Sequence, residues 1–253
     1  MKIVYSYFKT FNKVIWSEKV PFFYTLILPA IIFLMSNYGN IKNGASLNQI
    51  MSTSSNYLGY MIVATAVNGV ALQLINFREI GFLKTYTMIS GGERKYSVWG
   101  LICSEFLFGY VCVLIFSACL MFFYPTQIVH ILVVYTLTYV ISALPIMFVS
   151  ILADLLPVRN NTSGTLGNLL LVVLLWVSAV RVDSHSLVQE FLFGLDPCDY
   201  VTQVFDLVNR FTSHAHNIYS YQVLAVTGIF LIFLVLGIVC SSRVRINSEY
   251  MRN

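Results

Sequence analysis

Few side chains in this 253-residue chain could do chemistry. His214 and His216 are two residues apart, and no third ligand lies at a spacing typical of a metal site. Only one of the five cysteines, Cys198, lies in a polar region, and no CxxC pair exists for zinc or redox work. The phosphate-binding loop Gly-x-x-x-x-Gly-Lys-Ser/Thr and the hydrolase motifs Gly-x-Ser-x-Gly and His-Glu-x-x-His are missing too. We therefore expect no catalytic residue, no metal site and no cofactor bound by this chain.

Ionisable groups are also rare inside the apolar parts of the chain. Glu105 lies about two turns into one apolar run, and Asp154 ends another. A carrier driven by an ion gradient normally has ionisable groups near the middle of the membrane. The nearly bare middles of these runs therefore argue against ion coupling. They also disfavour an intramembrane enzyme, which needs paired carboxylates or histidine clusters at that depth.

A polar segment, residues 77–96, separates two long apolar runs and offers binding chemistry rather than catalysis. Read as one helix, the segment places four side chains on a single face at i, i+3, i+4 and i+7 spacing: Glu79, Phe82, Leu83 and Tyr86. A short amphipathic helix of this kind can insert into a groove on a soluble partner. The segment is thus predicted to be a protein-binding handle.

The composition indicates what holds this handle. The chain is 58% hydrophobic and only 10% charged, with a mean hydropathy of +0.76, whereas soluble domains are about 25% charged. Most of its surface must therefore face lipid. We predict an all-α integral membrane protein with one transmembrane domain over residues 1–253 and six spans, at 20–36, 58–75, 98–123, 128–153, 166–180 and 222–240.

Three further segments complete the predicted layout. Residues 2–17 have an apolar side and a lysine side, which is typical of a helix lying along the membrane surface; the alternative is an extension of the first span. Residues 37–56 are predicted to be a polar loop. Residues 181–219 look like one or two short helices lying on the membrane. Two amides inside the second span, Asn68 and Gln73, are either contacts between helices or part of a substrate pathway.

The distribution of basic residues predicts the orientation. Six spans place both termini on one side, together with the 77–96 segment and the loop at 154–165. That side holds 12 of the 15 basic residues: Lys2, Lys9, Lys13, Lys19, Arg78, Lys84, Arg94, Lys95, Arg159, Arg243, Arg245 and Arg252. The other side holds Lys42, Arg181 and Arg210. The positive-inside rule places both termini in the cytoplasm and segments 37–56 and 181–219 outside.

One motif points to a family. Arg78-Glu79-x-Gly81-x-Leu83-Lys84, shortly before a basic and aromatic entry into the third span, resembles the type-2 permeases of ABC transporters. These are six-helix membrane subunits of bacterial and archaeal exporters. The N-terminal surface helix and the outward segment between spans five and six agree with that layout. Pro197 and Tyr200 match a proline and aromatic pair that this outward segment often carries.

The resemblance implies a function and a set of partners. The coupling helix that sits in a cleft of a separate ABC ATPase subunit would comprise Arg78, Glu79, Gly81, Phe82, Leu83, Lys84 and Tyr86. ATP and Mg²⁺ would bind that ATPase. A translocation pathway would form with a second copy of the chain or with a homologous permease, in a bacterial plasma membrane. Membrane lipid would be a further partner, and with a net charge of +4 nucleic acid is not expected.

The cargo and two alternative functions stay open at this stage. The apolar and aromatic spans suit a hydrophobic or amphipathic cargo such as a peptide, lipid or drug. Small permeases of this kind often resemble those for antimicrobial peptide export or immunity. The first alternative is a membrane sensor, or an immunity or anchor protein, that binds an ATPase or kinase without transporting. The second is the intramembrane enzyme already disfavoured above.

Overall fold

The structure is a computed structural model that describes residues 2–17, 19–155, 160–179, 186–213 and 220–245. These residues form helices joined by short turns, and no strand occurs among them. The histidine pair at 214 and 216 lies outside the described residues, as do Arg159, Arg181 and Arg252. The predicted all-α class is confirmed for the part of the chain that is described.

Within the described residues, five helical stretches are long and apolar enough to cross a bilayer: Phe23–Lys42, Leu47–Glu79, Lys95–Phe123, Pro125–Leu155 and Ser220–Ser241. A shorter apolar stretch, Thr162–Ser178, falls where the fifth of six spans was predicted. The chain is thus a multi-pass membrane protein, and the sixth crossing stays a prediction.

Each stretch consists of one or more helical elements. The first is the π-helical η1 (Phe23–Ile27) with α3 (Leu28–Lys42), and the second is α4 (Leu47–Ala64), π-helical η2 (Thr65–Ala71) and α5 (Leu72–Glu79). The third is α7 (Lys95–Phe123). The fourth is η3 (Pro125–Gln127), α8 (Ile128–Ser150) and η4 (Ile151–Leu155). The shorter stretch is α9 (Asn160–Ala179), and the last is α12 (Ser220–Ser241).

The predicted polar loop at 37–56 is wrong. Helix α3 continues to Lys42 and α4 begins at Leu47, so only a tight turn separates them. The polar residues stay helical because their side chains bond to their own helix: Asn37 Nδ2 donates to the Phe33 carbonyl at 3.0 Å. Ser54 Oγ lies 2.7 Å from the Met51 carbonyl and also bonds to a tyrosine hydroxyl of α8. Side chains of this kind satisfy their own hydrogen bonds without breaking a packed helix.

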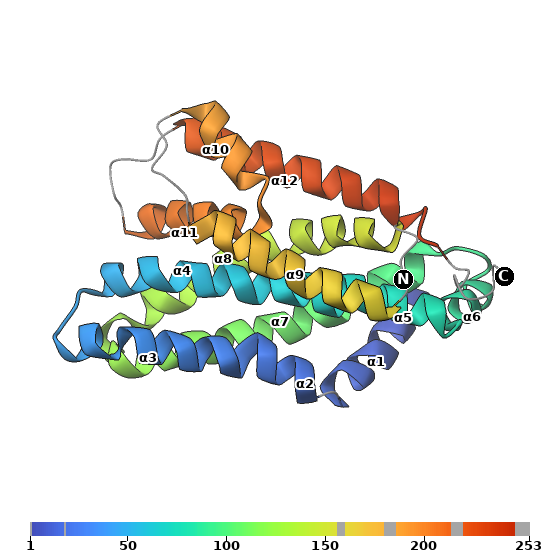
Figure 1. Cartoon of the computed structure of the whole chain (residues 1–253), viewed down its shortest axis with the longest axis horizontal. Helices are drawn as coiled ribbons and strands as arrows, with labels where there is room; N and C mark the ends of the chain where they lie inside the picture. The colour runs from blue at the N-terminus through green and yellow to red at the C-terminus, as the bar shows by residue number, and fades with distance from the viewer. Residues whose placement is uncertain (1, 18, 156–159, 180–185, 214–219, 246–253) are drawn as a thin grey trace.

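The long helices run side by side, and the connections gather at two ends (Figure 1). Helices α1 (Lys2–Ser17), α5 and α6 (Phe82–Ile89) lie at one end. The α3–α4 turn lies at the other end, together with α10 (Leu187–Gly194) and α11 (Pro197–Thr212). The 77–96 segment therefore lies at the opposite end of the bundle from the α3–α4 turn, α10 and α11, as the sequence predicts.

The N-terminal helix α1 has the predicted bounds and is fixed firmly to the bundle. Tyr7, Phe11 and Ile15 on one side are buried. Ser104 Oγ of α7 donates to the Phe8 carbonyl at 2.9 Å, and a side chain at Gly100 of α7 would clash with α1. The short helix α2 (Lys19–Phe22) then leads into η1.

Helix α11 lies deeper than expected. It was predicted to rest on the membrane surface, but its first half is buried and it packs against α4 and α8. Two of its buried polar side chains pair inside the protein: Gln203 Nε2 donates to Asp199 Oδ2 at 2.7 Å, and it also donates to the Glu190 carbonyl at 2.9 Å. Internal pairing of this kind removes most of the cost of burying polar side chains.

Candidate functional site

The predicted protein-binding handle is not one continuous helix. Helix α5 ends at Glu79, and α6 begins at Phe82 after Gly81, whose φ is +79°. Glycine adopts this left-handed conformation without the strain a side chain would bring. The prediction that Glu79, Phe82, Leu83 and Tyr86 share one helix face is therefore wrong, because the break at Gly81 reorients Glu79 relative to the other three.

One side of α6 is fixed to the bundle by an aromatic cluster. The Tyr7 hydroxyl donates to the Tyr86 carbonyl at 2.6 Å. The Phe11 ring stacks on Phe77 of α5, with centroids 5.3 Å apart, and meets the Tyr86 ring edge-on at 5.5 Å. Leu83 is only 1% exposed. Leu83 and one side of Tyr86 thus hold α6 in place and are not a free surface.

A buried ion pair anchors the preceding helix. Arg78 is fully buried, and its Nη1 donates to the Asp154 carbonyl at 2.8 Å and lies 3.3 Å from Asp154 Oδ1. The second carboxylate oxygen of Asp154 accepts the backbone N–H of Arg245 at 2.9 Å. Asp154 therefore joins the end of α5, η4 and the chain after α12. Arg78 is too deeply buried to contact a partner directly, and the Glu79 side chain is only 5% exposed.

The outer side of α6 and the residue before Gly81 are exposed. Ile80, Phe82, Met88 and Ile89 expose between 50% and 70% of their surface, and Lys84 is exposed beside them. The helix lies outside all five candidate spans. Of the seven residues predicted for coupling, only Phe82 and Lys84 are clearly on the surface. Sequence reasoning missed Met88 and Ile89, which complete this surface.

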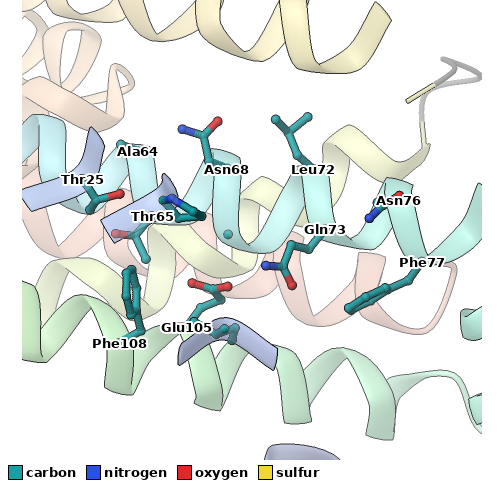
Figure 2. A pocket seen from close by; sticks show the side chains of 13 residues that line it. Thr25, Ala64, Thr65, Asn68, Leu72, Gln73, Asn76, Phe77, Glu105 and Phe108 are labelled. Atoms are coloured by element: carbon teal, nitrogen blue, oxygen red, sulfur yellow. The ribbon is translucent and has the colours of Figure 1, made fainter. Parts of the chain in front are cut away.

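The two predicted intramembrane amides line a cavity of about 190 Å³ between η1, η2, α5 and α7. Figure 2 shows Gln73 pointing toward Glu105, whereas Asn68 leaves the opposite side of its helix. The Glu105 side chain is 2% exposed, and a side chain at Gly69 would overlap its carboxylate. The structure therefore brings Gln73 together with Glu105, a charged residue to which the sequence analysis gave no role.

The predicted pair Pro197 and Tyr200 lies at the start of α11. Asp196 caps this helix, with its Oδ1 accepting the Cys198 N–H at 2.9 Å, and Pro197 takes the first helical position, which needs no N–H. Tyr200 is fully buried, with its ring 5.7 Å from that of Phe233 of α12. The pair thus anchors α11 in the bundle.

Comparison with known proteins gives no family assignment. No family model, no curated protein and no solved structure matches this chain.

Proposed function

We propose that this chain is the transmembrane subunit of an ATP-driven exporter of the ABC type, without an ATPase site of its own. The observation that carries the proposal is the exposed outer side of α6. This short helix at the end of two spans is fixed on its inner side, and its outer side is mostly apolar, with Lys84 beside the apolar side chains. An exposed apolar surface outside the spans is suited to a protein partner. The partner would be a cytoplasmic ABC ATPase, and both termini would lie on its side of the plasma membrane.

The fixed inner side of α6 would carry motion into the bundle. A partner pressing on Phe82 and Met88 moves α6 against Tyr7 of α1, and the aromatic cluster extends this contact to α5. The Arg78–Asp154 pair links α5 to η4 and to the chain after α12. ATP-driven closure of the partner would therefore shift several spans. The pathway would form with a second copy or a homologous permease.

A large apolar cavity supports a hydrophobic or amphipathic cargo. It measures about 760 Å³ and lies between η2, α8 and α9, with aliphatic side chains forming most of its wall. Apolar cavities of this size suit the apolar part of a lipid, peptide or drug-like molecule.

The test is a matched pair of phenylalanine substitutions. Phe82 is 50% exposed on α6 and Phe211 is 70% exposed at the end of α11, at the opposite end of the bundle. Phe82→Asp should weaken binding of the co-expressed ATPase at least about tenfold and remove the ATPase stimulation, whereas Phe211→Asp should do neither. Equal ATPase binding and turnover in both variants would refute the proposal. Binding without cargo flux in vesicles would instead favour the sensor or anchor function.

A further inference from the structure

The cavity beside Glu105 combines an unpaired hydrogen-bond acceptor with a negative charge. Glu105 is the one charged residue among the described residues that line it. Gln73 Oε1 is buried and has no hydrogen-bond partner within the described part of the chain. The Thr65 hydroxyl gives its hydrogen to the Met61 carbonyl at 2.8 Å, so it presents lone pairs to its surroundings. Buried acceptors are normally paired. The cavity is thus complementary to a group that carries N–H donors.

The carboxylate of Glu105 favours a positive charge on that group. A carboxylate in a low-dielectric site is stabilised most by a cation that also donates hydrogen bonds to it. The rings of Phe108 and Phe77 form part of the wall, and aromatic faces attract cations. Figure 2 shows Phe108 and Glu105 projecting from α7 into the same space, with Gln73 above Glu105.

The position of the cavity suits the head of an amphipathic molecule. Glu105 is ten residues into α7, which is about 15 Å along the helix. Ile15 of α1 and Pro21 of α2 also line the cavity. It therefore lies where the surface helix joins the first span, which is where the charged head of a molecule with an apolar tail would enter.

We propose that this cavity binds a primary ammonium group, with Glu105 as its counter-ion and Gln73 Oε1 as a hydrogen-bond acceptor. The ammonium group belongs either to an amphipathic amine that the protein carries or to an ethanolamine lipid headgroup. A quaternary ammonium has the charge but no N–H, so it leaves Gln73 Oε1 without a partner. The site requires only this chain and is independent of ATPase coupling.

The first experiment compares three eight-carbon probes on the purified protein in neutral detergent. Octylammonium should raise the melting temperature more than octanol, which lacks the charge, and more than octyltrimethylammonium, which lacks the donors. The same order should appear in calorimetric affinities, with octylammonium at least about tenfold tighter than octanol. Equal effects of octylammonium and octanol would overturn the proposal.

Substitutions then assign the effect to the cavity. Glu105→Gln should abolish the preference for octylammonium over octanol, while Glu93→Gln makes the same change at an exposed position and should retain it. Gln73→Leu keeps the charge and removes one acceptor, so it should reduce the advantage of octylammonium over octyltrimethylammonium, and it can be measured even if Glu105→Gln fails to fold. An undiminished preference in Gln73→Leu and in any folded Glu105→Gln protein would also overturn the proposal.

Lipid nanodiscs distinguish the two sources of the ammonium group. Octylammonium affinity is measured in phosphatidylethanolamine and in phosphatidylcholine nanodiscs. Weaker affinity in phosphatidylethanolamine shows competition by the lipid headgroup, and equal affinity in both identifies an amine cargo. If octylammonium binds no more tightly than octanol in either nanodisc, the proposed ammonium site is contradicted. No ATPase is present in these measurements, so their failure would leave the coupling proposal untouched.

Discussion

Single residues decide how the two ends of this bundle are fixed, and Asp154 is the clearest case. Asp154 and Arg78 are both fully buried, and Asp154 also accepts the Arg245 N–H. Removing one partner of a buried ion pair leaves the other charge without its main counter-ion, which costs about 3–5 kcal/mol. Glu79 also contacts Arg78, which favours the lower end of that range.

Asp154→Ala should therefore lower the free energy of unfolding in detergent by about 3 kcal/mol. The exposed pair of Glu93 and Lys95, 3.2 Å apart, provides the control. Because solvent screens it, Glu93→Gln should change the free energy of unfolding by less than about 1 kcal/mol. Chemical denaturation of both variants checks the prediction. Similar small losses in the two would mean that the Arg78–Asp154 pair does not hold these elements together.

Asp196 predicts a pH dependence at the opposite end of the bundle. Burial raises the pKa of Asp196 from 3.8 to about 6, with a smaller upward contribution from the charge of Asp199, while the Cys198 N–H opposes the rise. The folded protein therefore holds this proton more tightly than the unfolded chain. The stability that the proton gives is complete below about pH 4 and is lost as the pH rises through about 6.

Asp196→Asn keeps an acceptor for the helix cap and removes the titration. Its melting temperature should match that of the unmodified protein near pH 4 and exceed it above pH 6, with the difference developing between those values. Thermal melts from pH 4 to 8 in detergent measure this directly. A difference that stays constant over that range would show that Asp196 does not titrate in this window.

At the scale of helices, sequence patterns predict long apolar elements well and short polar ones poorly. Runs such as 98–123 can satisfy their backbone in lipid only as helices, so their existence follows from composition alone. The helical first half of α4 does not follow from composition, because it depends on Ser54 bonding to the Met51 carbonyl and to Tyr135 of α8. The burial of α11 likewise depends on the pairing of Asp199 with Gln203 inside the bundle.

The candidate site also has features that the sequence predicts and features that it does not. The position of the 77–96 segment between two spans and its polar composition were readable from the sequence. The burial of Arg78 was not, because its partner Asp154 is 76 residues away. The proximity of Glu105 to Gly69 and Gln73 is also tertiary, because Glu105 lies on one span and the other two residues lie on another. The only signal in the sequence was a glutamate inside an apolar run. The sequence did not show that Gly69 leaves room for its carboxylate between the helices.

Close helix contact gives a prediction for α12. A side chain at Gly237 would place its Cβ 2.6 Å from the carbonyl carbon of Phe148 on α8, and neither helix backbone can move away cheaply. Gly237→Ala should cost about 1–3 kcal/mol of stability. Gly228 lies on the same helix, but its added Cβ would meet Phe191 at an ordinary 3.6 Å.

Gly228→Ala should therefore be neutral, or stabilising by about 0.5–1 kcal/mol, because alanine favours the helix. Detergent denaturation of the two variants side by side makes the comparison. Equal stability of the pair would mean that α8 and α12 are not packed as closely as the structure has them.

For the whole molecule, the proposed function depends on which end faces the cytoplasm. Lys84 on α6 and Lys42 at the end of α3 are both exposed and lie at opposite ends of the bundle. If the end with most of the basic residues is cytoplasmic, as the positive-inside rule requires, Lys42 faces the outside and Lys84 faces the cytoplasm. Lys42→Cys and Lys84→Cys, made in a chain whose five cysteines are replaced by serine or alanine, report on the two ends.

A membrane-impermeant maleimide added to intact cells should label Lys42→Cys, and Lys84→Cys should react only after permeabilisation. Both positions carry a lysine and both are exposed, so a difference in labelling reports on sidedness rather than on burial. Labelling of Lys84→Cys in intact cells would place α6 outside, where no ATPase could bind it, and would exclude the proposed coupling. The ammonium site would be unaffected, because it depends on the surroundings of Glu105 and not on the direction in which the bundle is inserted.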